Sequence, residues 1–274
     1  MTPRIHVYSA PADKFFVNSF IVETDTSLVL VDTQFLVSTA RALRARLDAL
    51  AKPLAAVIVT HPHPDHYNGL PVVLEGRPAI PVYANAATIE GIRATQAGKR
   101  AAWTPVYGDD YPTADGLPDH ELGPDETLLI DGAELRLIDL GPMECADNTM
   151  IHVPQADALI ASDLVYNGCH PWLAEHRTTA WLDRLDEVGR QFGAVATVYA
   201  GHGAPGTTAL LDAQRRYIAE FRESVERRLR GGRLDPGAVS AVAAETRYGR
   251  NGWPLDGLVE MNIEAVATEL KACT

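Results

Sequence analysis

The chain has 274 residues, of which 46% are hydrophobic and 22% are charged, and its formal net charge is -12 at pH 7. This length and apolar fraction suffice for one large domain with a sizeable core. The acidic charge disfavours nucleic-acid binding, which rests largely on Lys and Arg meeting phosphate, and disfavours an anionic membrane surface. The apolar runs are too short to span a bilayer.

The first residues contain no apolar core between a cationic start and a cleavage site, so we expect no secretory signal. The three cysteines, Cys145, Cys169 and Cys273, form neither a Cys-x-x-Cys motif nor a paired framework. These features predict a reduced, cytoplasmic protein with incidental thiols.

The predicted elements alternate between strands and helices. The apolar runs 20–22 and 28–31 predict a hairpin, and Ser38 is expected to cap a helix that ends by Leu50. Residues 55–59 then predict a buried strand. Asn85 is expected to cap a helix that runs towards Ala97.

Residues 101–125 are rich in Pro, Gly, Asp and Tyr, which predicts a long surface loop near the mouth of a site. Further strands are predicted at 127–130, 133–140, 150–153, 158–161 and 197–200, with Asp131-Gly132 turning between the first two. Apolar periodicity predicts helices over 207–229, 236–246 and about 258–270. Alternating strands and helices indicate the α/β class.

A dense histidine motif follows the strand predicted at 55–59. The segment Thr60-His-Pro-His-Pro-Asp-His-Tyr-Asn-Gly69 places three histidines and one aspartate within six positions. Each proline holds the histidine before it extended, so we expect His61, His63 and Asp65 to share one face. His66 then turns off that face and can serve a second ion. Imidazole and carboxylate are ligands of zinc, iron and manganese. The alternative is a polar turn that is rich in histidine by chance, but a buried cluster of this density would still need metal ions or opposite charges as partners.

Two further candidate ligands stand where later strands end. Asp163 closes the run Ala-Leu-Ile-Ala-Ser-Asp, and His202 follows Val-Tyr-Ala-Gly. Alone, each has a plain structural reading, as a turn-capping aspartate and as a loop histidine beside glycines. Together they support the interpretation as metal ligands, because side chains at the ends of neighbouring strands converge in an α/β fold.

These motifs resemble the metallo-β-lactamase superfamily, whose signature is His-x-His-x-Asp-His, a third histidine, a bridging aspartate and a last histidine. The hairpin from Asn18 to Thr33 resembles the family's opening strands, and Gly201-His-Gly203 resembles its closing loop. The resemblance implies a four-layered αββα sandwich with the site along one edge of its sheets. We expect one domain over residues 1–274, with a core at about 16–206 and a helical extension at about 207–274.

One position departs from the family's pattern. Where the family usually has Gly-His-Thr, this chain reads Gly141-Pro-Met-Glu-Cys-Ala-Asp-Asn148, which puts Glu144 in the place of the third histidine. Glutamate oxygens can bind a metal. Cys145 is the rival ligand and would favour zinc, and a third reading leaves the first ion with two histidines and the bridge. We rank Glu144 first and Cys145 second.

The resemblance divides the ligands between two divalent metal ions. We expect zinc, and the oxygen ligand Glu144 would also allow manganese or iron. The first ion is assigned His61, His63 and Glu144, and the second Asp65, His66 and His202, with Asp163 bridging. Such a pair lowers the pKa of a shared water and yields a hydroxide nucleophile. Asp65 is placed to carry a proton to the leaving group. Tyr166 resembles the oxyanion donor of the family's lactone-opening members, and packing at the strand edge is an equal alternative.

The expected reaction is hydrolysis of a small ester or lactone. The main enzymatic rival is a glyoxalase-II-like thioester hydrolase, whose anionic thiol carrier could meet Arg215, Arg216, Arg222, Arg227, Arg228 and Arg230. A solvated helix face explains that run better, since Glu220, Glu223 and Glu226 are interleaved with it. A metal-binding sensor or partner module with little turnover is the alternative from another class. Five weaker candidates for the mouth of the site are Tyr67, Trp103, Tyr107, His170 and Trp172.

Overall fold

The computed structural model describes residues 2–123 and 125–272, so Cys273 lies outside the described residues. The strands are β1 Arg4–Ser9, β2 Asn18–Glu23, β3 Leu28–Val31, β4 Leu54–Ile58, β5 Val82–Ala84, β6 His120–Glu121, β7 Thr127–Ile130, β8 Ala133–Asp139, β9 Thr149–Val153, β10 Ala158–Tyr166, β11 Thr197–His202, β12 Leu229–Arg230 and β13 Arg233–Leu234. The α-helices are α1 Val37–Ala49, α2 Pro64–Tyr67, α3 Leu70–Leu74, α4 Ala86–Tyr107, α5 Thr178–Phe192, α6 Ala209–Glu226, α7 Ala238–Arg247 and α8 Leu258–Ala272. Short 3-10 turns lie at Gly108–Asp110 and Pro154–Ala156.

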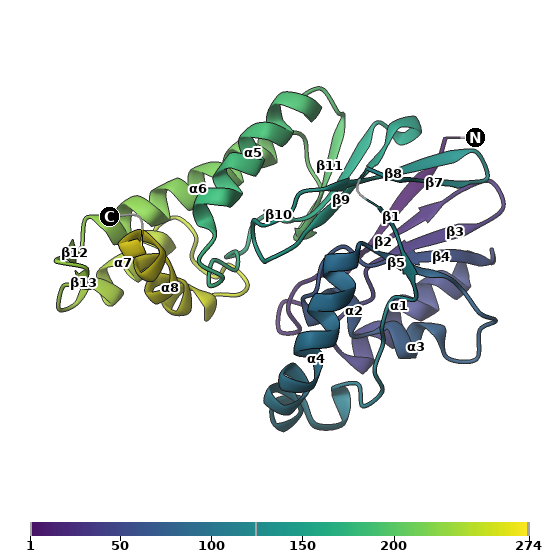
Figure 1. Cartoon of the computed structure of the whole chain (residues 1–274), viewed down its shortest axis with the longest axis horizontal. Helices are drawn as coiled ribbons and strands as arrows, with labels where there is room; N and C mark the ends of the chain where they lie inside the picture. Colours follow the sequence, from purple (N-terminus) through teal and green to yellow (C-terminus); the bar gives the residue numbers. More distant parts are fainter. Residues whose placement is uncertain (1, 124, 273–274) are drawn as a thin grey trace.

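Two β-sheets pack face to face and carry helices on their outer faces (Figure 1). The strand order is β1-β2-β3-β4-β5-β6 in the first sheet and β11-β10-β9-β8-β7 in the second. Alternation along β3 explains the layers: Val29 and Val31 enter the core between the sheets, while Leu28 and Leu30 pack under α1. On the other side α5 and α6 cover the second sheet. The expected four-layered αββα sandwich is confirmed.

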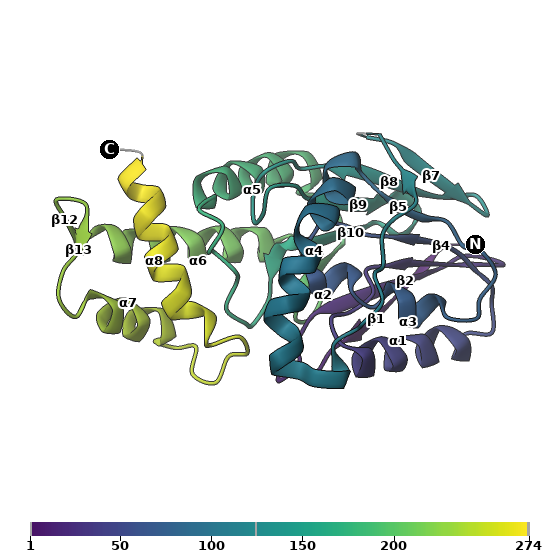
Figure 2. The same ribbon diagram turned by 60° about the horizontal axis from the view of Figure 1, so that its bottom comes forward.

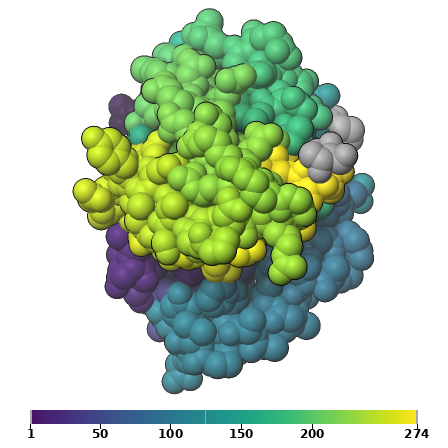
Figure 3. All heavy atoms as spheres, turned by 90° about the vertical axis from the view of Figure 1, so that its left-hand side faces the viewer, coloured from purple at the N-terminus to yellow at the C-terminus, as the bar shows by residue number. Residues whose placement is uncertain are grey.

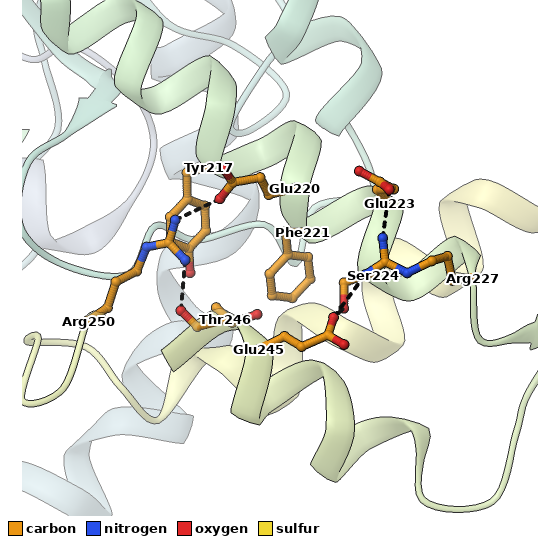
Figure 4. A pocket seen from close by; sticks show the side chains of 9 residues that line it. All are labelled: Tyr217, Glu220, Phe221, Glu223, Ser224, Arg227, Glu245, Thr246 and Arg250. Atoms are coloured by element: carbon orange, nitrogen blue, oxygen red, sulfur yellow. Dashed lines mark hydrogen bonds and ion pairs between the residues drawn. The ribbon is translucent and has the colours of Figure 1, made fainter. Parts of the chain in front are cut away.

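The helices after β11 build one end of the molecule (Figures 1 and 2). Ion pairs tie α6 to the helix and loop that follow it, with Arg227 to Glu245 at 3.0 Å and Arg250 to Glu220 at 2.9 Å (Figure 4). Arg227, a member of the basic run, is thus paired with a carboxylate of the same helical unit. Among the described residues, no helix has the length and apolarity needed to cross a bilayer.

The prediction of a loop beginning at residue 101 is wrong, because α4 continues to Tyr107. Pro105 lies in its last turn, where the missing N–H costs the helix one hydrogen bond. Aromatic packing favours the helix here: the rings of Trp103 and Tyr107 stand edge-on to Phe35 at 5.7 and 5.5 Å. The cap at Asn85 is confirmed, since its side chain accepts from the Thr88 N–H at 2.7 Å.

The predicted cap at Ser38 is wrong. Helix α1 begins at Val37, with Leu36 as the flanking residue. The Ser38 N–H and hydroxyl both donate to Asp110, at 2.7 and 2.8 Å. A carboxylate distant in sequence therefore satisfies the Ser38 N–H at the start of this helix, while the Thr39 hydroxyl accepts from the Leu36 N–H at 3.3 Å.

Candidate metal centre

The histidine motif bridges the end of β4 and the start of α2. His63 is extended, with φ -81° and ψ 139°, and Pro64 begins the helix, where its fixed φ is already suitable. The prediction that Asp65 shares an extended face with His61 and His63 is therefore wrong. Asp65 lies in the first turn of α2 and faces the same region as His66.

Parallel pairing of β10 with β11 brings the remaining candidates to this edge of the sandwich. Asp163 lies within β10, and His202 ends β11, where it pairs with Tyr166. Glu144 lies in the loop between β8 and β9, and its side chain is buried. The strands approach so closely that a Cβ at Gly201 would lie 1.9 Å from the Asp163 carboxylate. Glycine before His202 is thus a packing requirement.

The side chains that could bind a metal form three overlapping groups, each with its ligand atoms within 4.8 Å of one another. The groups are His61, His63, Glu144 and Cys145; His61, His66 and Asp163; and Asp65, His66 and His202. Asp163 thus lies between the two outer groups. The structure brings together all seven residues that the sequence proposed as ligands, in an arrangement compatible with two ions.

The distances suit a metal better than direct hydrogen bonds. The Asp163 carboxylate lies 3.3 Å from His66 Nε2, 3.4 Å from His202 Nε2 and 3.7 Å from His61 Nε2. Asp65 Oδ2 lies 3.5 Å from His202 Nε2. Two ligand atoms bound tetrahedrally at about 2.0–2.1 Å from one zinc ion are about 3.3–3.4 Å apart.

Several buried atoms at the centre have no hydrogen-bond partner among the described residues. They are Nε2 of His61, Nε2 of His66, Oδ1 of Asp163 and both carboxylate oxygens of Glu144, of which Oε1 lies 3.1 Å from His63 Nδ1 without the geometry of a hydrogen bond. An unpaired buried polar group costs about 1–3 kcal/mol, so several such groups at one point favour a bound ligand. Divalent cations would satisfy all of them, and the residues present therefore fit a metal pair.

Three histidines are oriented by partners outside the centre. His66 Nδ1 donates to Asp32 Oδ2 at 2.7 Å, and His202 Nδ1 donates to the Phe15 carbonyl at 2.9 Å. His61 Nδ1 lies 3.0 Å from the Thr60 hydroxyl. These contacts leave each Nε2 facing inward, as in metal-binding histidines. Sequence reasoning missed Asp32, although a carboxylate directly after β3 was a usable signal.

The centre attracts positive charge. Burial opposes ionisation of Asp163, yet His66 and His202 hold the pKa of its carboxyl well below its usual range. Burial likewise opposes the charged form of His66, but Asp163 and Asp65 raise its pKa well above the ordinary value. Burial lowers the pKa of His61, which keeps that imidazole in the neutral form that metals bind.

The surroundings of Glu144 and Cys145 differ. Glu144 Oε1 lies 3.1 Å from His63 Nδ1, and its other oxygen lies 4.0 Å from His61 Nε2. The Cys145 thiol donates to the Asp147 carbonyl at 3.1 Å, and burial raises its pKa well above the usual range. Burial raises the pKa of the Glu144 carboxyl as well, so the two candidates differ by geometry: Glu144 faces the histidines, whereas the Cys145 thiol is engaged by the Asp147 carbonyl.

Two further charged residues at the centre escaped sequence reasoning. Glu175 Oε1 lies 3.5 Å from His63 Nε2, on the side of the ring away from Glu144. Lys99, on α4, donates to the Pro62 carbonyl at 2.9 Å. Both line the cavity that leads to the centre. They come from elements far apart in sequence, and no local motif marks them.

Tyr166 is engaged with the central carboxylate. Its hydroxyl donates to Asp163 Oδ2 at 2.6 Å, and its ring stacks on His202 with centroids 4.6 Å apart and planes 3° from parallel. The tyrosine thus contacts two of the candidate ligands. This geometry supports a role in positioning Asp163, beside the oxyanion role that the resemblance implies.

Tyr166→Phe removes this hydrogen bond and keeps the ring. We expect metal affinity to fall by about 10–100-fold, the usual effect of losing a partner that orients a ligand. The measurement is metal titration against a competing chelator, with circular dichroism to check folding. A fall in turnover of about 10² with full metal affinity would instead support the oxyanion role. No change in either quantity would leave Tyr166 as a packing residue.

A cavity of about 200 Å³ leads to the centre, and Trp103 and Trp172 line it together with His63, Asp65 and His202. The other three side chains proposed for the mouth have different surroundings. Tyr67 is buried in the core beneath α1, Tyr107 packs on Phe35, and His170 Nδ1 lies 2.7 Å from the Tyr217 hydroxyl.

Comparisons with known proteins agree with the fold and the motifs. A family model described as the metallo-beta-lactamase superfamily matches residues 12–238. A relative from Bacteroides fragilis, "Metallo-beta-lactamase type 2", is 25% identical over 216 residues, which make up 77% of this chain and 78% of that protein. A metallo-beta-lactamase structure from Pontibacter korlensis matches with a TM-score of 0.63 at 21% identity, over 78% of this chain and 94% of that one. The DIM-1 metallo-beta-lactamase matches with a TM-score of 0.61 at 19% identity, over 80% and 93%. The structural matches show the fold, and the family match over most of the sequence shows that the chain belongs to the metallo-beta-lactamase superfamily.

Proposed function

We propose that the protein is a hydrolase that holds two divalent metal ions and cleaves a small ester or lactone. The observation that carries the proposal is the convergence of seven buried or nearly buried ligand side chains, four of which (His61, His66, Glu144 and Asp163) have inward atoms without a hydrogen-bond partner among the described residues. His61, His63 and Glu144 would hold one ion, Asp65, His66 and His202 the other, and Asp163 would contact both. When bound, the ions would polarise the substrate carbonyl and lower the pKa of a water between them.

The protein's own residues supply orientation and proton transfer. Water adds to the carbonyl carbon, the bond from that carbon to the alkoxy oxygen breaks, and the alkoxy oxygen takes a proton. Asp65 is the candidate proton carrier, because its carboxylate reaches the cavity and lies 3.5 Å from His202 Nε2. Tyr166 would keep Asp163 in position through its 2.6 Å hydrogen bond.

The character of the cavity supports a neutral carboxyl derivative, the class that includes esters and lactones. Aromatic and aliphatic side chains make up much of its lining, which suits a neutral carboxyl derivative. A thioester of an anionic carrier is less well supported, since Arg215 pairs with Asp186 at 2.7 Å and Arg222 with Glu269 at 3.1 Å. The name of the Bacteroides fragilis relative makes a β-lactam a necessary comparison.

The test is elemental analysis of the purified protein beside a panel of chromogenic ester, lactone, thioester, β-lactam and phosphodiester substrates. We expect close to two transition-metal ions per chain and the highest kcat/KM on an ester or lactone. Dialysis against chelator should remove activity, and added metal should restore it. Full activity without bound metal would contradict the metal centre, and a higher kcat/KM on another class would contradict the substrate assignment.

A further inference from the structure

The C-terminal segment supplies one wall of the cavity above the metal centre. The family model ends at residue 238, yet Leu255, Leu258 and Met261 line the same cavity as His63 and Asp65. Leu258 and Met261 are three residues apart on α8, so they lie next to each other on one helix face. This wall is therefore formed by residues outside the matched region.

The facing wall is an aromatic cluster. The rings of Phe15 and Phe35 lie 4.5 Å apart, and Trp103 on α4 stands edge-on to both at 5.7 Å. In Figure 3 the yellow C-terminal segment lies beside the blue surface that contains α4, and side chains of both helices line the cavity. An incoming molecule would thus pass between apolar side chains before it reaches His63 and Asp65.

The wall is held firmly against the loop that precedes α5. The buried side chain of Asn262 accepts from the Leu173 N–H and donates to the Pro171 carbonyl, each at 2.8 Å. These bonds flank Trp172, which lines the same cavity. The ion pairs of Figure 4 also fix the segment before α8 to α6, through Arg250 and Glu220. The wall is preformed, which lowers the entropic cost of binding.

Met261 stands out because 53% of this large apolar side chain is exposed, at the rim of the cavity. Each methylene group that such a surface buries is worth about fourfold in affinity. The pocket of Figure 4 is a weaker candidate for ligand binding. The guanidinium groups of Arg227 and Arg250 that line it already form ion pairs with carboxylates.

We propose that Leu258 and Met261, opposite Trp103, select substrates that carry an extended apolar group of several carbon atoms. The group lies between the two walls, and the reactive carbonyl lies at the inner end beside Asp65. This inference rests on the proposed ester or lactone hydrolysis and adds the substrate class to it. The polar side chains at the inner end, His63, Glu144 and Lys99, set the orientation.

The test is a series of p-nitrophenyl esters from acetate to octanoate, used with the metal-loaded protein. For the wild type we expect kcat/KM to rise by about fourfold per methylene group over the first few carbons. Met261→Glu should lower the octanoate-to-acetate ratio of kcat/KM by about tenfold or more, mainly through KM. Leu258→Ser should act in the same direction. Leu129→Glu is the matched control, because Leu129 is 64% exposed on β7 and outside the cavity.

Calorimetric binding of octanoate and acetate separates this inference from the proposed function. Tighter binding of octanoate that Met261→Glu removes and Leu129→Glu keeps would support the apolar wall even if no ester is cleaved. In that case the proposed function would fail alone. Cleavage of esters with no dependence on chain length, or equal effects of Met261→Glu and Leu129→Glu, would overturn the inference and leave the hydrolase intact.

Discussion

Asp163→Ala is expected to release both metal ions and abolish turnover. Its carboxylate is buried and lies 3.3 to 3.7 Å from the inward nitrogens of His66, His202 and His61. Alanine removes the atoms proposed to contact both ions, and it leaves the Tyr166 hydroxyl without its acceptor. We expect metal affinity to fall by more than the ~10–100-fold that loss of an outer partner causes.

Elemental analysis after gel filtration, together with chelator competition, measures this effect. Asp183→Ala is the control for the change in charge, because Asp183 is exposed on α5 and outside the cavity. Circular dichroism of both variants separates metal loss from unfolding. Full metal loading with wild-type turnover in Asp163→Ala would show that another group joins the two sites.

The site could be located from sequence because its signals are local. Prolines next to His61 and His63 limit the backbone, and His66 follows directly in α2. Asp163 and His202 were recognisable because each closes an apolar run. His202 does end its strand, but Asp163 lies within β10, which continues to Tyr166, so the expected strand end at Asp163 is wrong. The sandwich itself was expected from the resemblance to the family, because β3 is apolar at all four positions and its sequence does not show which side chain faces which layer.

What the sequence could not supply depends on contacts between distant segments. Asp110 caps the start of α1 from 72 positions beyond Ser38, and Glu175 meets His63 from the loop before α5. Helix α4 continues to Tyr107, into the stretch expected to be a loop, because its aromatic side chains pack on Phe35. At α1 and α4 a tertiary contact outweighs the local preference, and the contact of Glu175 with His63 has no local signal at all.

Helix α5 and the contact of Tyr166 with Asp163 were both missing from the sequence prediction, for different reasons. Helix α5 was absent from the sequence prediction although its buried residues, Trp181, Leu185, Val188 and Phe192, follow helical spacing, so the signal existed. The contact of Tyr166 with Asp163 is different. Residues three apart in a regular strand face opposite sides, but β10 is irregular near Ser162, which has φ of +47°. No local pattern indicates that irregularity.

Glu144→His is expected to strengthen zinc binding at the first site relative to manganese. Glu144 offers a hard, anionic oxygen within 3.1 Å of His63 Nδ1, whereas histidine offers a neutral nitrogen, which zinc prefers and manganese does not. We expect the zinc-to-manganese affinity ratio to rise by about tenfold or more, the scale of single changes around a metal. Glu144→Ala should instead lower the metal content by about one ion per chain.

Titration of each metal against a competing chelator measures the ratio, and it does not depend on turnover. Cys145→Ser is the matched comparison, because Cys145 belongs to the same group of potential ligands and its thiol already donates to the Asp147 carbonyl. If Glu144 is the ligand, Cys145→Ser keeps the native metal content and preference, since a hydroxyl can make the same hydrogen bond. If both Glu144 variants bind metal as the native protein does and Cys145→Ser loses zinc, then the thiolate is the ligand. Zinc would then be favoured over manganese in the native protein, because thiolate is a soft ligand.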